Sequence, residues 1–285
     1  MDKIDPQKIV EIRKIQKWQK QNVPETAIAK GFKKYKNYYV PEKVVKNSVR
    51  VLSFGVGADV KFEKLMCKDN QNLQVKLFDP TPMTTKYIGE IIKKSSAKTV
   101  GSFWNIKIAR KCFEYKPIAY APVNGIQKFY YSENNRQNRD DDSASTWQSE
   151  LNIQPNTVYN IDVFSLKKEK GNRSIDVDCN NLETIMNDLN WGDVDIIKAD
   201  IEGMWWEFCN ELLDKNIKFK YLVMEWELVF EDLSIVLEKA KTLCDRFKQN
   251  GYNVCQNKER NKMVLELIFI RKDVEEFINK PHHTY

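Results

Sequence analysis

Short runs rich in β-branched residues alternate along this chain with longer segments whose apolar residues recur at helical spacing. Such alternation predicts an α/β protein built on a central sheet. The first unit is a strand at 49–54, a turn at Gly55-Val56-Gly57 and a helix that starts near residue 60. A second strand, 74–79, ends in a carboxylate. Together these segments predict the entry of a nucleotide-binding βαβ unit.

The alternation continues to the end of the chain. Further strands are predicted at 117–122, 126–131, 158–166, 174–177, 194–199, 219–224, 252–256 and 263–270. Further helices are predicted at 6–21, 25–35, 83–94, 100–113, 180–189, 204–208 and 233–248. Asn124-Gly125 favours a hairpin turn between strands 117–122 and 126–131, on the nucleoside side of the sheet. The length of 285 residues fits one α/β domain, 41–285, preceded by a helical extension, 1–40.

Composition excludes several classes of protein. No apolar run approaches the ~20 residues that a bilayer requires, and the N-terminus lacks the apolar segment of a secretory signal, so we expect a cytoplasmic protein without membrane partners. The six cysteines form no C-x-x-C pair, which predicts buried reduced thiols. The two histidines are His282 and His283, so a classical zinc site is not expected and no metal is predicted. The net charge of +6 comes from interspersed residues and does not predict a nucleic-acid partner.

The glycine turn and Asp79 carry the first chemical prediction. Closely spaced glycines let a ligand approach the backbone and allow positive φ. Asp79 stands 22 residues after Gly57 (79 − 57), which suits a carboxylate that grips two ribose hydroxyls. The turn lacks the third glycine at which a pyrophosphate would sit, so a nucleoside without phosphates, such as S-adenosylmethionine, is the predicted ligand. The alternative is a turn that serves only the strand-to-helix geometry.

Two later strands also end in carboxylates. Strand 194–199 is followed by Asp200 and Glu202, and strand 219–224 by Glu225 and Glu227. Ligands of open α/β sheets bind at the carboxyl ends of parallel strands, so these side chains are predicted to share one site with Asp79.

With these motifs in place, the chain resembles the FkbM-type S-adenosylmethionine-dependent methyltransferases. The similarity covers about 38–270. Its residues lie in three segments, 53–63, 78–82 and 195–203. The family more often has an aspartate where Ser53 stands, and a different glycine turn. Asp59 is interpreted as a replacement acidic contact.

The resemblance implies a Rossmann-like, seven-stranded class I methyltransferase sheet with helices on both faces. It also implies methyl transfer to a hydroxyl, on a sugar, a glycan or a related small molecule. The predicted cofactor contacts are Ser53, Gly55, Val56, Gly57, Asp59, Asp79, Pro80 and Asp200. Asp200 and Glu202 are the candidate catalytic groups, because methyl transfer to a neutral alcohol needs a base and histidine is confined to the C-terminus. The alternative is that Glu202 caps a helix and Asp200 is a solvated strand end.

Other features allow more than one interpretation. Trp205, Glu225 and Glu227 are candidate substrate contacts, with core packing as the alternative for Trp205. Basic residues alternate with tyrosines at 33–39, which fits RNA methylation or, alternatively, a solvated lysine face over packed tyrosines. The polar segment 132–149 is either an active-site lid or a disordered loop. A divalent cation between the carboxylates and a catalytically silent nucleoside- or glycan-binding module are further alternatives.

Overall fold

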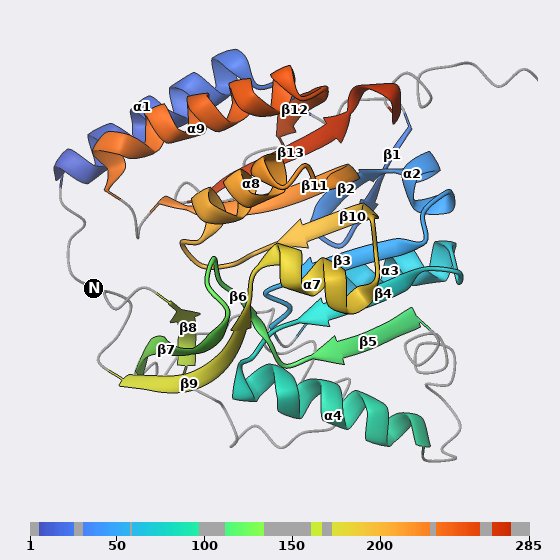
Figure 1. Ribbon diagram of the computed structural model, residues 1–285. Helices are drawn as coiled ribbons and strands as arrows, with labels where there is room; N and C mark the ends of the chain where they lie inside the picture. Colours follow the sequence, from blue (N-terminus) through green and yellow to red (C-terminus); the bar gives the residue numbers. More distant parts are fainter. Residues whose placement is uncertain are drawn as a thin grey trace, which may run out of the picture.

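The computed structural model describes residues 6–25, 31–57, 59–96, 112–133, 161–166, 173–228, 232–256 and 264–274. Its centre is a seven-stranded sheet (Figure 1). The strands are β3 (Arg50–Phe54), β4 (Gln74–Phe78), β5 (Phe113–Lys116), β10 (Asp193–Ala199), β11 (Lys218–Glu227), β12 (Tyr252–Gln256) and β13 (Val264–Arg271). Their order across the sheet is β12-β13-β11-β10-β3-β4-β5.

β13 runs antiparallel to both of its neighbours, β11 and β12. The remaining neighbouring pairs, from β11 through β10, β3 and β4 to β5, are parallel. The carboxyl ends of β3, β4 and β10 therefore meet at one edge of the sheet. This confirms the predicted Rossmann-like, seven-stranded sheet.

Helices cover both faces of this sheet, because each strand carries apolar side chains on both sides. One core contains residues of α1 (Pro6–Asn22), α7 (Leu182–Leu189), α8 (Trp205–Asp214) and α9 (Leu233–Gln249). The other core contains residues of α2 (Glu42–Lys46), α3 (Lys61–Asp69), α4 (Pro82–Ser96) and the hairpin of β1 (Phe32–Tyr35) and β2 (Tyr38–Pro41). Along β10, Ile196 belongs to the second core and Ile197 to the first, as the period of a strand requires.

The predicted N-terminal helix is present as α1, and the segment after it is tied to the main sheet. The backbone N–H of Gln256, on β12, donates to the carbonyl of Pro24 at 2.9 Å. The side-chain amide of Gln256 donates to the carbonyl of Val23 at 2.5 Å. Where a helix was predicted at 25–35, residues 32–35 instead form β1. Lys36 turns the chain with a φ of +54°, and Tyr35 packs in the second core.

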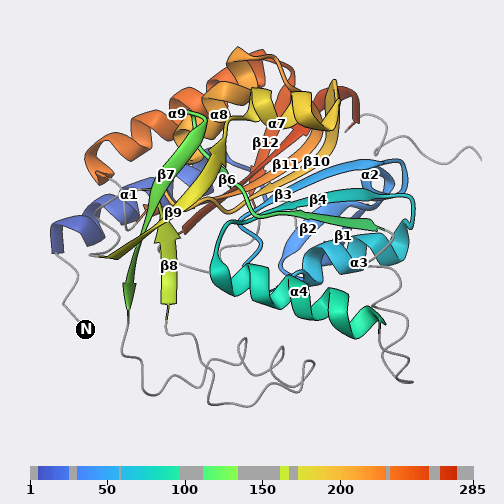
Figure 2. The same ribbon diagram turned by 60° about the horizontal axis from the view of Figure 1, so that its bottom comes forward.

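A second, four-stranded sheet was not predicted. It consists of β6 (Ala119–Tyr120), β7 (Gly125–Glu133), β8 (Ile161–Ser165) and β9 (Arg173–Asn180), in the order β6-β9-β7-β8 (Figure 2). The predicted hairpin between 117–122 and 126–131 is wrong, because β9 lies between β6 and β7 and pairs with both. Asn124 does not close a two-residue turn. Its side chain accepts from the Asn181 N–H at 2.8 Å and donates to Thr184 Oγ1 at 2.8 Å.

The third strand of the main sheet in chain order, β5, was not predicted. It begins at Phe113, the last residue of the helix predicted at 100–113. The rest of the helix predicted at 100–113 falls almost wholly outside the described residues. The loop at 132–149 and both histidines also lie outside them, apart from the end of β7. All six cysteines are free thiols, and five of them are buried. In the described part of the chain, no helix is long and apolar enough to cross a membrane.

Candidate cofactor and active site

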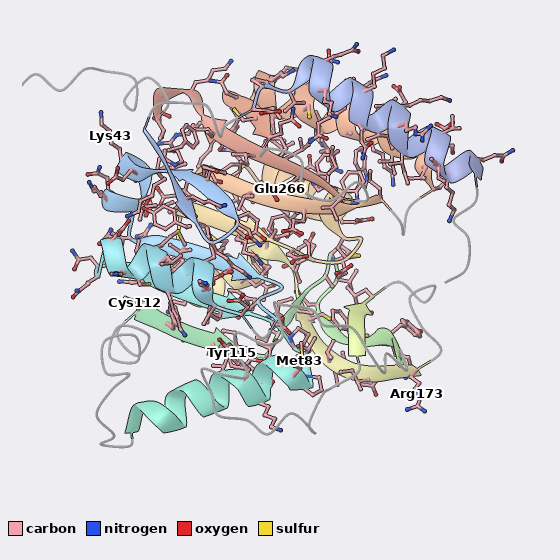
Figure 3. All side chains as sticks on the ribbon, turned by 180° about the vertical axis from the view of Figure 1, so that it is seen from behind. Lys43, Met83, Cys112, Tyr115, Arg173 and Glu266 are labelled. Carbon is pink, nitrogen blue, oxygen red and sulfur yellow. The ribbon has the colours of Figure 1, made fainter. Side chains whose placement is uncertain are left out.

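A cavity of about 170 Å³ opens at the carboxyl ends of β3, β4 and β10, beside the second sheet. It is the place where an open α/β sheet binds its ligands. Its polar lining contains Asp79, Thr81, Asp200 and Glu202. Its apolar lining includes Phe54, Phe78, Met83, Ala119, Tyr120, Phe129, Leu166, Ile201 and Met204. Met83, at the start of α4, is labelled in the rear view of Figure 3.

The two glycines of the turn after β3 have different structural roles. Gly55 has a φ of +65°, and a β-carbon there would stand 1.6 Å from the carbonyl oxygen of Asp200. Glycine is therefore required by the close approach of the two strand ends. Gly57 has a φ of +60°, but a β-carbon there would meet no described atom within 4 Å. Gly57 thus leaves its backbone open to a ligand in the cavity that it lines.

Asp79 holds the glycine turn from the neighbouring strand. Its Oδ2 accepts from the N–H of Gly57 at 2.8 Å. Its Oδ1 accepts from the Thr81 N–H at 2.8 Å and from Thr81 Oγ1 at 2.6 Å. The hydroxyl of Thr84 donates to the carbonyl of Gly57 at 2.8 Å and so fastens the turn from its other side.

These bonds limit the predicted ribose grip. An ionised carboxylate offers about four lone-pair sites, and three of those on Asp79 are already used. Asp79 is only 5% exposed. It has room for about one further hydrogen bond, so holding both ribose hydroxyls would require it to release Gly57 or Thr81. The role of Thr81 was missed, although a threonine two residues after an aspartate is a local signal for such a bond.

Asp200 and Glu202 lie together on the cavity wall, as predicted from the acidic end of their strand. The Asp200 side chain is 32% exposed, and its Oδ2 lies 3.9 Å from the Nζ of Lys198. Gly203 follows with a φ of +79°, and α8 begins at Trp205. The backbone turns directly after the two carboxylates and leaves them at the cavity.

Three of the predicted cofactor contacts lie away from the cavity. Ser53 is fully buried and donates from Oγ to Glu63 Oε1 at 2.5 Å. Val56 is 5% exposed and packs in the second core. Asp59 accepts from the Lys61 N–H at 2.8 Å and forms an ion pair with Lys36, so it holds the start of α3. The cavity wall therefore retains Gly55, Gly57, Asp79, Pro80 and Asp200 from the predicted set.

The predicted substrate contact of Trp205 is corrected by the structure. Its side chain is 1% exposed and stacks on Trp226 with ring centroids 4.2 Å apart and planes within 14°. Trp206 is the more exposed of the pair and meets Trp205 edge-on. Core packing, the alternative interpretation, thus holds for Trp205.

Glu225 is turned toward the second core and does not line the cavity. Its Oε1 accepts from the hydroxyl of Tyr38 at 2.5 Å. Burial raises the pKa of the Glu225 carboxyl, and the charge of Asp200 raises it further, against the opposing effects of Tyr38 and Lys198. The side chain of Glu227 lies outside the described side chains, so its predicted substrate contact stays a prediction.

The apolar wall was largely missed by sequence analysis, because much of it comes from the second sheet. Ala119, Tyr120 and Phe129 lie on β6 and β7. Phe54 and Phe78, from the main sheet, stack with centroids 4.8 Å apart, and Tyr120 meets Phe54 edge-on. An apolar, aromatic wall with a few acidic groups is the usual form of a site for a small organic ligand.

The basic and aromatic segment at 33–39 forms the β1–β2 hairpin. Tyr35 and Tyr38 are buried beneath it, while the ammonium of Lys33 pairs with Asp69 at 2.5 Å. Lys36 pairs with Asp59. This geometry matches the lysine face over packed tyrosines, and RNA binding at this segment stays an alternative.

Among the described residues, no group of three or more His, Cys, Asp and Glu side chains has an arrangement that could hold a metal ion. The carboxylates at the strand ends accordingly form no metal cluster in the described part of the chain.

No protein-family model matches the chain, and no curated protein matches it in sequence. Among solved structures, it is similar to precorrin-6y C5,15-methyltransferase of Geobacter metallireducens, with 10% identity, a TM-score of 0.34 and coverage of 81% of this chain and 86% of that one. An O-methyltransferase family protein of Burkholderia thailandensis has 9% identity and a TM-score of 0.37; the match covers 80% of this chain but only 52% of that one. The M. jannaschii TYW2 structure in complex with AdoMet has 11% identity and a TM-score of 0.31, over 81% of this chain and 74% of that one. Identities and TM-scores this low assign no function to the chain.

Proposed function

We propose that this chain is an S-adenosylmethionine-dependent methyltransferase. The observation that carries the proposal is the meeting of an open glycine turn, Asp79 and the pair Asp200 and Glu202 around one cavity at the carboxyl ends of β3, β4 and β10. These are the parts needed to hold a nucleoside and to place an acidic group beside its reacting end.

The lining fits this cofactor in two respects. Aromatic and aliphatic side chains offer a surface to a purine ring, and the exposed backbone at Gly57 allows close approach. The described polar lining is acidic, which favours a ligand that carries positive charge on sulfur and nitrogen. Gly57, Asp79 and Asp200 are the residues that would hold it, and bound S-adenosylmethionine would supply an electrophilic methyl group.

The chain's own residues then have two tasks. They align the acceptor oxygen with the methyl carbon, and alignment of this kind contributes several kcal/mol to catalysis. They also accept the proton that a hydroxyl loses as its oxygen forms the new bond. Asp200 and Glu202 stand on the cavity wall and are the proposed bases.

The finer proposal is an FkbM-type enzyme that methylates a hydroxyl on a sugar, a glycan or a related small molecule. It is supported by the FkbM-like motifs at 78–82 and 195–203, both of which reach the cavity. The domain division at residue 40, with α1 as an extension, also belongs to this proposal. The competing functions are RNA methylation and a catalytically silent nucleoside-binding module.

Calorimetry tests the cofactor. Titration with S-adenosylmethionine and S-adenosylhomocysteine should show binding, and Asp79→Ala should weaken it by about 1 to 3 kcal/mol through the lost charge-assisted hydrogen bonds. Asp193→Ala is the control, because this exposed carboxylate pairs with Arg50 at the opposite end of the strands. The absence of heat and of a thermal shift at millimolar ligand would overturn the proposal.

Transfer of a radiolabelled methyl group tests the chemistry and the acceptor class. Asp200→Asn and Glu202→Gln should slow transfer, whereas a truncation ending at Pro281 and added EDTA should leave it unchanged. Turnover lost on truncation, with both carboxamide variants active, contradicts the carboxylate base. Loss with EDTA alone favours a metal, salt-dependent RNA binding favours RNA methylation, and cofactor binding without transfer to any extract favours a silent module.

A further inference from the structure

A buried lysine stands between the glycine turn and the acidic strand end. Lys198, on β10, is 7% exposed, and its Nζ donates to the carbonyl oxygen of Gly55 at 3.0 Å. The carbonyl of Phe54 is a longer second acceptor at 3.5 Å. The same Nζ lies 3.9 Å from Asp200 Oδ2. One ammonium group thus contacts both the turn proposed to hold the cofactor and the carboxylate proposed to take the proton.

The groups around Lys198 come from every element packed against it. Its charged and titratable neighbours are Asp200 directly after the same strand, Glu63 on α3, Glu225 on β11, Asp79 after β4 and Tyr38 on β2. Lys36, in the β1–β2 turn, adds a positive charge beside Glu225. Burial alone would lower the pKa of the Lys198 ammonium, but the carboxylates outweigh it and raise that pKa. Lys198 is therefore a permanent cation at neutral pH.

Glu63 completes the arrangement beneath the turn. It is 1% exposed and takes the hydrogen bond of Ser53 on Oε1, and its Oε2 has no hydrogen-bond partner among the described residues. Lys198 is the cation whose charge acts on it. Glu63 is therefore a buried acidic side chain that acts on Lys198 without lining the cavity.

We propose that Lys198 is a positioning residue for methyl transfer, whose buried ammonium fixes the Gly55 carbonyl and the Asp200 carboxylate relative to each other. This rests on the function proposed above. Lys198 does not line the cavity, so it acts through these two groups and not on the acceptor. Two measurable consequences follow, one for cofactor affinity and one for the pH dependence of transfer.

Removing the positive charge of Lys198 should change both the cofactor affinity and the pH dependence of methyl transfer. Without its donor, the Gly55 carbonyl loses a charge-assisted bond, and S-adenosylhomocysteine should bind roughly tenfold more weakly. Without the cation, carboxylates at the strand end become harder to ionise. The pH at which transfer is half-maximal on the acid side should therefore rise by about one unit. A purely structural lysine would change stability and leave this pH unchanged.

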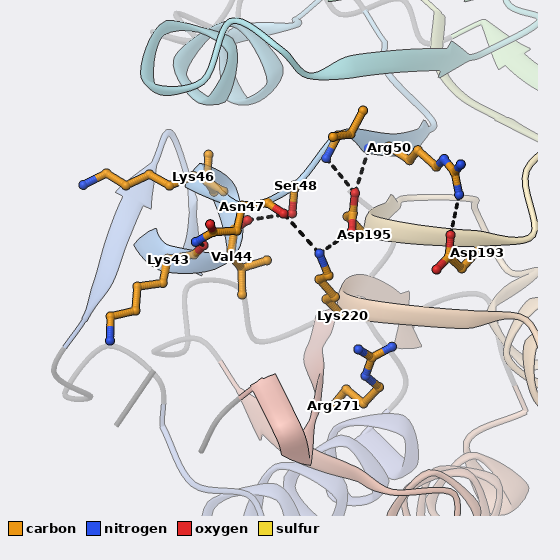
Figure 4. A network of polar contacts seen from close by, with 12 residues as sticks. Lys43, Val44, Lys46, Asn47, Ser48, Arg50, Asp193, Asp195, Lys220 and Arg271 are labelled. Carbon is orange, nitrogen blue, oxygen red and sulfur yellow. Dashed lines mark hydrogen bonds and ion pairs between the residues drawn. The ribbon is translucent and has the colours of Figure 1, made fainter. Parts of the chain in front are cut away.

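The chain offers a matched control in Lys220. It makes the same kind of contacts at the opposite end of the strands: its Nζ donates to the Asn47 carbonyl at 3.1 Å and pairs with Asp195 at 2.6 Å (Figure 4). Lys220→Met thus removes an ammonium that ties a backbone carbonyl to a carboxylate, but far from the cavity. It should lower stability and leave both readouts as in the wild type.

The experiment compares Lys198→Met, Lys198→Gln, Lys198→Arg and Lys220→Met with the wild type. Folding is checked by circular dichroism, affinity by calorimetry with S-adenosylhomocysteine, and the acid limb by single-turnover methyl transfer. The proposal predicts weaker binding and a raised acid limb in a folded Met or Gln variant, and a wild-type limb in Lys198→Arg and Lys220→Met.

Either neutral variant that folds and retains the wild-type affinity and acid limb overturns the proposal. If neither neutral variant folds, Lys198→Met and Lys198→Gln are repeated in a Glu63→Gln background, which removes one of the buried carboxylates that act on the lysine. A raised acid limb relative to Glu63→Gln alone upholds the proposal, and an unchanged limb contradicts it. A wild-type protein that neither binds the cofactor nor transfers methyl defeats the proposed function itself, which is a distinct result.

Discussion

The α-carbon of Gly55 faces the carbonyl oxygen of Asp200 so closely that an added β-carbon would stand 1.6 Å from it. The contact joins the ends of β3 and β10, and the N–H of Asp200 also donates to the carbonyl of Phe54 at 3.2 Å. The turn proposed to hold the cofactor and the strand end proposed to hold the base are therefore one rigid unit.

Gly55→Ala should consequently destabilise the protein severely, by more than about 4 kcal/mol, because its β-carbon would collide with backbone. Gly57→Ala is the matched variant: it has a similar φ of +60° but open space, so it should cost only about 1 to 2 kcal/mol. Urea unfolding measures both. Equal losses would show that positive φ, and not the contact with Asp200, determines the need for glycine.

The stacked tryptophans give a second prediction. Trp205→Ala should cost about 3 to 5 kcal/mol, because it empties a site against Trp226 in the core. Trp206→Ala should cost about 1 to 2 kcal/mol, because this ring is partly exposed. Denaturant unfolding of the two variants distinguishes them, and a larger loss at Trp206 would contradict the placement.

Asp195 should contribute to the free energy of unfolding, and this contribution should disappear in acid. It accepts from the Val49 and Arg50 N–H groups at 2.6 and 2.8 Å and pairs with Lys220 (Figure 4). Burial opposes ionisation, but these bonds outweigh it and lower the pKa of the Asp195 carboxyl. Because the pKa of Asp195 is lowered in the folded state, its ionised carboxylate stabilises the fold at pH values above the usual pKa of 3.8. This stabilisation is lost as the pH falls through the lower pKa of the folded state.

Asp195→Asn should therefore cost about 2 kcal/mol at pH 7, and less as the pH falls below 4. Asp193→Asn, two residues earlier and exposed, is the control and should cost less than about 1 kcal/mol. Urea unfolding across pH checks both. A loss at Asp195 that is the same at every pH would exclude a charge effect.

Glu63 predicts the opposite dependence. Burial raises the pKa of its carboxyl, although Lys198 and Ser53 act against this. With a raised folded-state pKa, the associated stability is present below the usual value of 4.5 and declines as the pH rises through the folded value. The stability of Glu63→Gln relative to the wild type should thus increase from pH 4 to pH 8. Glu238→Gln, on an exposed face of α9, should show no such trend.

Features of the site that depend on residues close together in the sequence could be predicted. The run into Gly55 and Gly57, the carboxylate at Asp79 and the acidic end after β10 are local patterns, and parallel pairing brings them to one edge. The burial of Trp205 could not be predicted in this way. Trp205 and Trp206 are adjacent on one helix, and only the packing of that helix decides which of them meets Trp226. Ser53 and Glu63 were not connected for the same reason, since their contact depends on how α3 packs under the turn.

The second sheet was beyond a local argument. β6 and β7 are close in sequence and were predicted to pair, but β9, which follows far along the chain, lies between them. Apolar alternation shows that each of these segments is a strand and leaves the identity of its partner open. Three of the cavity residues that were missed, Ala119, Tyr120 and Phe129, lie on these strands.

The walls of the cavity are therefore held by different hydrophobic cores. Gly55, Asp79 and Asp200 are held by the large cores of the main sheet, whereas Phe129 packs on a small core of its own with Val177 and Cys179. Changes at sites that share no contacts have nearly independent effects on stability. Mutations in the small core around Phe129, which unlike Tyr120 of the same sheet lies outside the main cores, should thus change one wall of the cavity while the glycine turn stays intact. The surface offered to an acceptor can then change without loss of the proposed cofactor site.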